Sequence, residues 1–183
     1  RRMSDGSYQE INADAVKNLY EPGSVFKPMS FLVAMDDGYM HMNDIVDVGC
    51  GVKEMYGAMM RDANWRSGGS GVVNVPQILQ KSLNVGVSVL IDRYYHEQPE
   101  NALPWMSIGY ETQVPPITTV TFYNALANNG KMLRPRLVKA ILKNGQVIQE
   151  FPPVVLREQM AKPEAVKNIR DILESVVSIG TGK

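Results

Sequence analysis

The sequence has almost no cysteine and no net charge. It contains one cysteine, Cys50, among 183 residues, which excludes an internal disulfide and any metal site built on Cys-x-x-Cys spacing. We expect Cys50 to be a small buried apolar residue. Nineteen basic residues balance nineteen acidic ones, so no overall field attracts nucleic acid or an anionic membrane surface. Nucleic-acid binding is therefore not expected.

Long apolar runs are also missing from the sequence. No stretch approaches the roughly 18 consecutive apolar residues of a membrane span, and residues 1–5 lack the apolar core of a signal peptide. With 183 residues, 44% of them hydrophobic, the chain has enough material for one core and too little for two. Because it starts without methionine and ends on Gly180-Thr181-Gly182-Lys183, we expect it to be part of a longer protein.

The spacing of apolar residues predicts a mostly helical chain with one β-hairpin. Asn144-Gly145 suits a type I′ turn between strands at 136–142 and 146–151. Residues 39–74, rich in Gly, Asn, Asp and Ser, predict mostly irregular connection. Gly130 is expected to end a helix in the left-handed conformation. The helices are expected at residues 13–19, 25–35, 75–83, 85–95, 117–129 and 163–177.

A serine and a lysine three residues apart are the first candidates for chemistry. Ser24 and Lys27 lie on one face of a helix start, and Pro28, which fits only in the first turn, places Ser24 beside the helix N-terminus. A lysine whose pKa is lowered by burial can take the proton of a serine nucleophile. Taken alone, the motif is more often an N-cap serine followed by a solvated lysine.

A second polar motif stands at the junction of two predicted helices. Ser82 and Asn84 are two residues apart in Lys81-Ser82-Leu83-Asn84, where both side chains can point into a cleft. Ser82 could relay a proton between Lys27 and a leaving group, and Asn84 could hold a substrate amide. A polar helix break capped by Ser82 or Asn84 is the simpler explanation of this motif alone.

Together the two motifs match the Ser-x-x-Lys and Ser-x-Asn elements of penicillin-binding proteins and serine β-lactamases. The segment from Tyr20 to Pro28, YEPGSVFKP, resembles the nucleophile signature of monofunctional class B penicillin-binding proteins. Three later segments continue in that family's order, namely 107–110, 124–130 and 134–138. The resemblance covers nearly the whole chain and is closer to the division (septal) members than to the elongation members.

This resemblance implies a fold, a reaction and a role for each candidate residue. The fold would be the α+β fold of penicillin-binding transpeptidases and serine β-lactamases. Ser24 would attack the D-Ala-D-Ala carbonyl of a peptidoglycan stem peptide, with Lys27 as general base. Ser82 would relay the proton, and Asn84 would bind the peptide or a β-lactam side chain. The backbone N–H of Ser24 would form part of the oxyanion hole, and no metal or organic cofactor is implied.

The sequence departs from the family's pattern at three places. The third motif, Lys-Thr-Gly or Lys-Ser-Gly, does not occur in the chain, so we expect residues 1–183 to be a partial transpeptidase domain without its C-terminal strands, and this part by itself to be inactive. A family segment is expected to be missing near residues 101–102. Glu111 stands where the family commonly has glycine.

Rival functions stay open on the sequence. A D,D-carboxypeptidase or a β-lactamase would use the same scaffold, and a class A β-lactamase needs an acidic residue that activates water. Asp92, Glu97 and Glu100 are available but have no recognisable context. A non-catalytic β-lactam sensor or scaffold is a further alternative.

Partners and location follow from the resemblance alone. It implies peptidoglycan stem peptides and β-lactam antibiotics as ligands, and a glycosyltransferase and other division-complex membrane proteins as partners. It places the catalytic domain on the periplasmic side of the cell inner membrane, with the anchor outside this chain.

Overall fold

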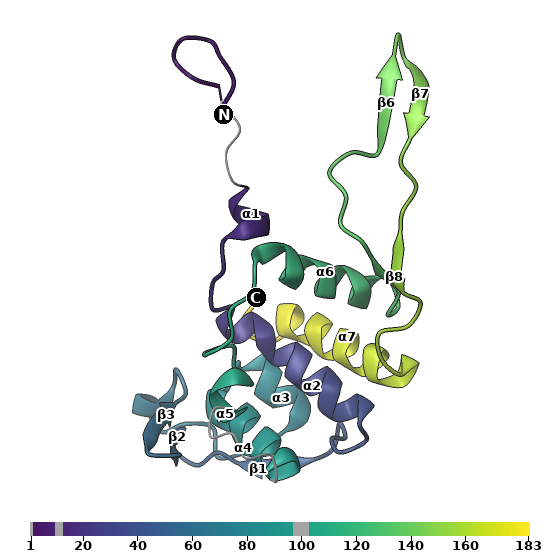
Figure 1. The fold of residues 1–183 in the computed structure, drawn as a ribbon. Helices are drawn as coiled ribbons and strands as arrows, with labels where there is room; N and C mark the ends of the chain where they lie inside the picture. Colours follow the sequence, from purple (N-terminus) through teal and green to yellow (C-terminus); the bar gives the residue numbers. More distant parts are fainter. Residues whose placement is uncertain (1, 10–12, 97–102) are drawn as a thin grey trace.

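The computed structural model describes residues 2–9, 13–96 and 103–183. Helices gather into one body, from which an N-terminal segment and a β-hairpin project (Figure 1). The helices are α1 (Asp14–Lys17), α2 (Lys27–Asp36), α3 (Val75–Gln80), α4 (Asn84–Tyr95), α5 (Leu103–Met106), α6 (Pro116–Ala127) and α7 (Pro163–Ser178), with 3₁₀ turns η1 (Gly23–Phe26) and η2 (Trp65–Ser67). The strands are β1 (Ile45–Asp47), β2 (Val52–Met55), β3 (Ala58–Arg61), β4 (Val72–Asn74), β5 (Met132–Leu133), β6 (Ala140–Lys143), β7 (Gln146–Glu150) and β8 (Val155–Arg157).

Helix α2 lies in the middle of the helical body and packs against α4 and α7 (Figure 1). Pro28 stands in its first turn, where a missing N–H leaves no hydrogen bond unmade. Phe31 and Ala34 are fully buried on this helix, whereas Val33 is half exposed. The buried side chains of α2 therefore form the part of the core that fixes where the helix, and the η1 turn before it, can lie.

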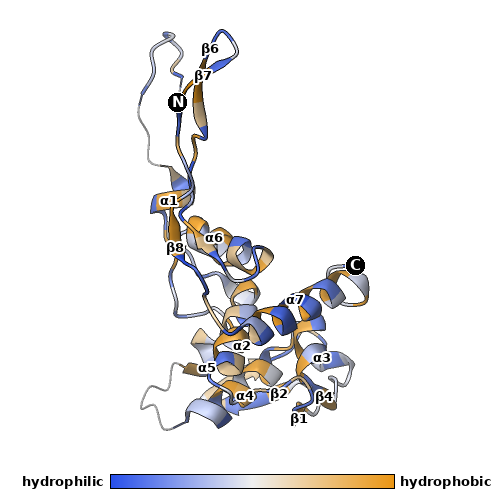
Figure 2. Cartoon of the chain, turned by 90° about the vertical axis from the view of Figure 1, so that its right-hand side faces the viewer, coloured by the Kyte–Doolittle hydropathy of each residue, from blue (hydrophilic) through white to orange (hydrophobic). Residues whose placement is uncertain are grey.

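Helix α7 packs against α2 and α3 with a clearly amphipathic sequence (Figure 2). Ile169 and Ile172 are 0% and 1% exposed, while Lys167 and Asp171 form an i,i+4 ion pair of 2.6 Å on the exposed side. This is the periodicity that predicted a helix at 163–177, and the prediction is confirmed.

The junction between α3 and α4 is built from local sequence signals. Asn74 and Gln77 form a capping box at the start of α3, with Asn74 Oδ1 accepting from the Gln77 N–H at 3.0 Å. The helix ends at Gln80, and Ser82 adopts a left-handed conformation with φ of +52°. Buried Leu83 leads into α4. The two helices predicted from the sequence are confirmed, and the break between them carries the Ser-x-Asn motif.

The prediction that residues 39–74 are mostly irregular holds for most of the segment but is wrong for four short strands. This segment forms two antiparallel pairs, β1 with β4 and β2 with β3, in which Val46 pairs with Val73 and Val52 with Arg61. The strands are three or four residues long, and the glycine-rich turns between them hid their short apolar alternation. The expectation of a buried Cys50 is also wrong, because Cys50 lies exposed in a turn before β2.

The predicted hairpin is confirmed, with shorter strands. Asn144 and Gly145 have φ of +52° and +79°, as a type I′ turn requires, between β6 and β7. Gly130 has φ of +92° after α6, which ends at Ala127 rather than at the expected residue 129, and Asn129 is left-handed too. The described residues form four two-stranded antiparallel sheets beside the helices. The expected α+β fold with a dominant helical part is confirmed.

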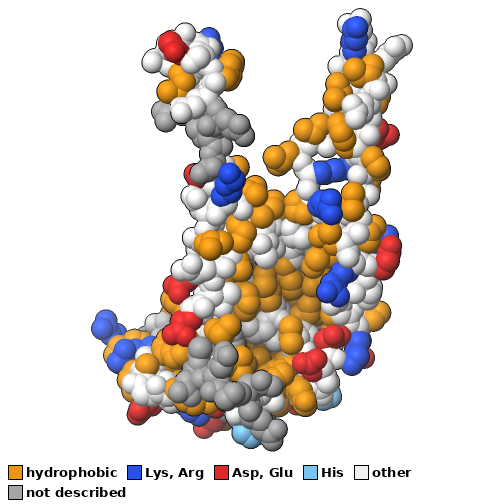
Figure 3. Space-filling model, viewed as in Figure 1, with side chains coloured by type: hydrophobic (Ala, Val, Ile, Leu, Met, Phe, Trp, Pro, Cys, Tyr) orange, Lys and Arg blue, Asp and Glu red, His pale blue; other side chains and the backbone are white. Residues whose placement is uncertain are grey.

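An apolar groove of about 600 Å³ lies between α2, α6 and the base of the hairpin. Figure 3 shows hydrophobic side chains gathered in the hollow between the N-terminal segment and the hairpin. Leu137, at 92% exposure, belongs to this lining. Other groove residues include Met29, Ile117, Phe122, Met132 and Leu156.

We predict that Ile169→Ala lowers the free energy of unfolding by about 2–5 kcal/mol, because it leaves a cavity in the core beneath α7. Val177→Ala on the same helix is the matched control. Its side chain is 64% exposed, so its effect should stay within about 0.5 kcal/mol. Urea unfolding followed by circular dichroism measures both variants, and equal losses would contradict the packing described here.

Candidate active site

The candidate nucleophile lies on the η1 turn directly before α2. Gly23 opens the turn with φ of +59°, and Ser24 follows with an exposed side chain. The backbone N–H of Lys27 donates to the Ser24 carbonyl oxygen, which joins the turn to the first residue of the helix. Ser24 is thus held at the surface by a helix whose own side chains are anchored in the core.

Lys27 and Ser82, which are far apart in the sequence, meet in the structure. The Lys27 side chain is 1% exposed, and its Nζ donates to the Ser82 carbonyl oxygen at 2.7 Å and to Ser82 Oγ at 3.1 Å. The left-handed backbone of Ser82 lets its carbonyl and its hydroxyl face the same ammonium. A buried ammonium is costly unless its donors are satisfied, and these two acceptors partly meet that need.

Burial changes the acid–base behaviour of Lys27. Desolvation lowers its pKa from 10.5 to about 8, and the negative charge of Asp62 opposes this shift. Asp62 is itself 1% exposed, and burial raises the pKa of its carboxyl. Sequence reasoning missed Asp62, because an aspartate between a short strand and a polar turn carries no motif. An amine with a pKa near 8 can be neutral near physiological pH and can therefore accept a proton.

The other two predicted residues are placed differently. Asn84 is half buried, and its Nδ2 donates to the Arg61 carbonyl oxygen at 2.8 Å, which ties the Ser-x-Asn segment to β3. Among the described residues, the hydrogen bonds of Lys27 Nζ go to Ser82, and none joins it to Ser24 Oγ. The structure therefore brings Lys27 and Ser82 into direct contact, with Ser24 on the same turn of backbone as Lys27.

The segment from Ser107 to Glu111 supports the nucleophile turn from behind. The Gly23 N–H donates to the Gly109 carbonyl oxygen at 3.1 Å, and Ser30 Oγ donates to the Ser107 carbonyl oxygen at 2.9 Å. A Cβ on Gly109 would lie 2.2 Å from the Gly23 oxygen, so only glycine fits there. Glu111 has φ of +56°, which explains why glycine is suited to its position.

The family model for the penicillin-binding protein transpeptidase domain matches this chain at residues 2–104 and 96–183. The chain belongs to the penicillin-binding protein transpeptidase family. The resemblance predicted from the sequence motifs is thereby confirmed. The two matched parts overlap at residues 96–104. The junction near 101–102, where a family segment is predicted to be missing, lies outside the described residues, and that absence stays a prediction.

Curated relatives match the chain over most of its length. It is 29% identical to penicillin-binding protein 1A of Aquifex aeolicus, over 97% of this chain and 26% of the relative. It is 25% identical to stage V sporulation protein D of Bacillus subtilis, over 92% of this chain and 31% of the relative. The chain thus spans about a quarter to a third of the length of these relatives. Relatives such as the second agree with the class B assignment.

Solved structures share the fold at low sequence identity. The D,D-transpeptidase domain of a peptidoglycan glycosyltransferase from Eggerthella lenta superposes with a TM-score of 0.80 at 20% identity, over 92% of this chain and 51% of that one. Penicillin-binding protein A from M. tuberculosis, as an imipenem acyl-enzyme complex, gives 0.79 at 16% identity, over 93% and 46%. These similarities establish the transpeptidase fold.

The acidic residues considered for a β-lactamase have other surroundings or lie outside the described residues. Asp92 accepts a hydrogen bond of 2.6 Å from the Tyr56 hydroxyl, and Glu97 and Glu100 fall in the range that the structure does not describe.

Within residues 2–9, 13–96 and 103–183, no group of three or more His, Cys, Asp and Glu residues could hold a metal ion. Over the same ranges, no helix has the length and apolar character to cross a membrane.

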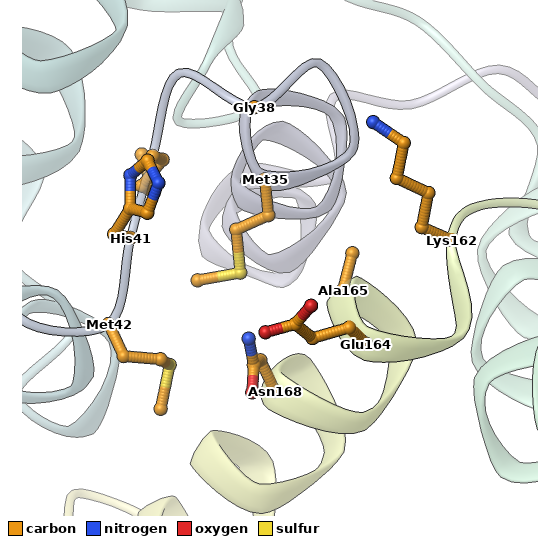
Figure 4. Close-up of a pocket in the computed structure, with 9 residues that line it drawn as sticks. Met35, Gly38, His41, Met42, Lys162, Glu164, Ala165 and Asn168 are labelled. Carbon is orange, nitrogen blue, oxygen red and sulfur yellow. The ribbon is translucent and has the colours of Figure 1, made fainter.

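A pocket of about 370 Å³ between the end of α2 and the start of α7 is separate from these residues. Figure 4 shows Met35, His41, Met42 and Glu164 around it. None of its lining residues is among Ser24, Lys27, Ser82 or Asn84. The candidate site is accordingly the Lys27–Ser82 contact and the turn beside it.

We predict that Gly109→Ala destabilises the protein by more than Gly57→Ala. Both glycines have nearly the same positive φ, +85° and +82°, but a Cβ at residue 109 meets the Gly23 backbone, whereas one at residue 57 meets nothing within 4 Å. Both variants should lose roughly 1 kcal/mol through backbone strain, and Gly109→Ala should lose several times that. Thermal unfolding of the two variants checks the difference; equal melting temperatures would show that the contact behind Ser24 is not tight.

Proposed function

We propose that the chain carries the nucleophile and the general base of a peptidoglycan D,D-transpeptidase. Membership of the transpeptidase family supports the reaction class. The observation that carries the proposal is the buried Lys27 ammonium, whose pKa is lowered to about 8 and which bonds to the Ser82 hydroxyl. A lysine in that state, one helical turn from an exposed serine, is suited to proton transfer in acyl transfer chemistry.

In the proposed acylation step, neutral Lys27 takes the hydroxyl proton of Ser24 while Ser24 Oγ attacks the D-Ala-D-Ala carbonyl of a stem peptide. A tetrahedral intermediate forms, and its oxyanion is stabilised by backbone N–H groups that include that of Ser24. The C–N bond to the terminal D-alanine then breaks. The proton passes from Lys27 through Ser82 Oγ to the leaving amine, so that Lys27 is neutral again.

In the second step an amine from a neighbouring stem peptide attacks the Ser24 ester. The new amide bond is the cross-link, and Ser24 recovers its proton through the same groups. Asn84 is proposed to contact the peptide through its side-chain oxygen Oδ1, since its Nδ2 donates to the Arg61 backbone carbonyl oxygen. A β-lactam would acylate Ser24 in place of the donor peptide, as the imipenem complex of the M. tuberculosis relative illustrates for that protein.

The complete enzyme is proposed to need parts that this chain does not carry. The chain spans 26% and 31% of the curated relatives described above, and a third-motif strand would complete the oxyanion hole and bind the substrate carboxylate. By the same resemblance we propose a membrane-anchored protein with an extracytoplasmic catalytic domain, acting with a glycosyltransferase and other division proteins.

We predict that a form of the protein carrying the third-motif strand gains one penicilloyl mass on exposure to a penicillin and keeps it for hours. Ser24→Ala should abolish this gain, because it removes the nucleophile. Ser67→Ala, at an exposed position on η2, is the matched control and should leave acylation unchanged. Intact-mass spectrometry measures all three proteins.

Other outcomes would change the assignment. Loss of the penicilloyl mass within minutes would favour a β-lactamase, in which water deacylates the serine. An unmodified protein would favour a non-catalytic scaffold. Acylation that persists in Ser24→Ala would contradict the choice of nucleophile.

The acylation rate is predicted to rise with pH through a midpoint near 8. Lys27 acts as base only when neutral, and its pKa in the folded protein is lowered to about 8, so the reactive fraction grows tenfold per pH unit below that value and levels off above it. Stopped-flow acylation by a chromogenic cephalosporin between pH 6 and 9.5 measures this profile. A flat profile across that range would argue against Lys27 as the base.

A further inference from the structure

Asp62 is a buried carboxylate that lies next to the proposed site without belonging to either motif. It follows β3 directly, is 1% exposed, and interacts electrostatically with Lys27. Its backbone is fixed as well, since the Asp62 N–H donates to the Gly51 carbonyl oxygen at 2.8 Å. A carboxylate so completely removed from water is costly unless a positive charge or several hydrogen bonds compensate it.

One oxygen of Asp62 holds the segment that carries Ser82 and Asn84. Its Oδ1 accepts a hydrogen bond of 2.9 Å from the backbone N–H of Val85, the residue directly after Asn84. The preceding residue makes a parallel tie, because the Arg61 carbonyl oxygen accepts from Asn84 Nδ2 at 2.8 Å. Residues 61 and 62 together therefore fix the first turn of α4, and with it the place of the Ser82 oxygens that meet Lys27.

The second oxygen of Asp62 has no hydrogen-bond partner among the described residues. This oxygen, Oδ2, lies beside Gly51: a Cβ placed on Gly51 would be 3.2 Å from it. The same Cβ would be 3.6 Å from Asn64 Oδ1, which is another buried acceptor without a partner among the described residues. The Asp62 carboxyl is compensated by the backbone N–H groups of Val85 and Asn84 and, to a smaller extent, by the charge of Lys27.

We propose that Asp62 is a positioning residue for acyl transfer: it holds the Ser-x-Asn segment against Lys27 and provides the counter-charge of the Lys27 ammonium. This inference rests on the proposed function. Asp62 does not touch the reacting atoms; it acts through Lys27 and Ser82. The negative charge of Asp62 raises the pKa of Lys27, so that the amine can hold a proton that it takes up. The burial of Lys27 lowers the same pKa, so that part of the amine is neutral and can accept a proton.

Other charged groups near these elements are directed elsewhere. The Arg61 guanidinium lies over the Trp65 ring at 5.4 Å, Lys81 is exposed, and Glu21 accepts a hydrogen bond from the Glu111 backbone N–H. Within the described part of the chain, Asp62 is the charge that acts on Lys27. A change in the titration of Lys27 on removal of the Asp62 charge can therefore be assigned to this pair.

The Asp62→Asn substitution removes the negative charge of residue 62 but keeps an oxygen that can accept the hydrogen bond from the Val85 N–H. Because this hydrogen bond can still form, the fold should be retained. Removal of the charge should move the titration midpoint of Lys27 to lower pH, by on the order of one unit. Asp62→Ala removes the hydrogen bond too, and should in addition lower the melting temperature and slow acylation.

Two measurements keep this inference distinct from the proposed function. NMR titration of ¹³C-labelled lysine, with the Lys27 signal assigned from Lys27→Arg, reports the midpoint whether or not the protein is active. The pH profile of penicillin acylation reports the same group in the reaction. Asp47→Asn, at an exposed carboxylate on β1, controls for a general change in net charge and should move neither.

A Lys27 midpoint that is lower in Asp62→Asn than in the parent, with the acylation profile displaced in the same direction, supports the inference. An unchanged midpoint in a folded Asp62→Asn overturns it, and Asp62 is then only a structural residue of the α4 start. If the parent is not acylated but its Lys27 midpoint depends on Asp62, the proposed function fails while the electrostatic interaction between Asp62 and Lys27 stands.

Discussion

A lysine ammonium with 1% exposure is the constraint on which the rest of this site depends. A buried ammonium is costly unless hydrogen-bond acceptors or an opposite charge compensate it. Ser82 supplies two acceptors from the α3–α4 junction, and Asp62 supplies the charge from the end of β3. The start of α2, the α3–α4 junction and the end of β3 are distant in sequence and are therefore required to lie near one another.

The same constraint explains why Ser24 is exposed while Lys27, three residues later, is buried. The η1 turn leaves Ser24 at the surface, where a substrate can reach it, while the first turn of α2 carries Lys27 into the core. Gly109 closes the turn from behind through its contact with Gly23. An exposed serine beside a buried amine fits the acyl transfer through a serine ester that we propose for this chain, and membership of the transpeptidase family supports that reaction class.

Much of this could be predicted from the sequence, and the failures have physical causes. Helical periodicity and caps located α2, α3, α4 and α7, and the Asn-Gly pair located the hairpin, because those signals are local. The strands in residues 39–74 were missed since they are too short for alternation to stand out from glycine-rich turns. Asp62 was missed because its importance lies in a long-range contact with Lys27, and Cys50 was misplaced because composition alone cannot tell a turn from a core.

A crystal structure of a form of the protein that carries the third-motif strand, after reaction with a penicillin, tests the proposed roles of Ser24 and Lys27 most directly. We predict continuous electron density between Ser24 Oγ and the opened lactam carbonyl, with Lys27 Nζ still within hydrogen-bonding distance of Ser82 Oγ. Density attached to any other side chain, or a Lys27 side chain turned out into solvent in the acylated protein, would contradict these roles.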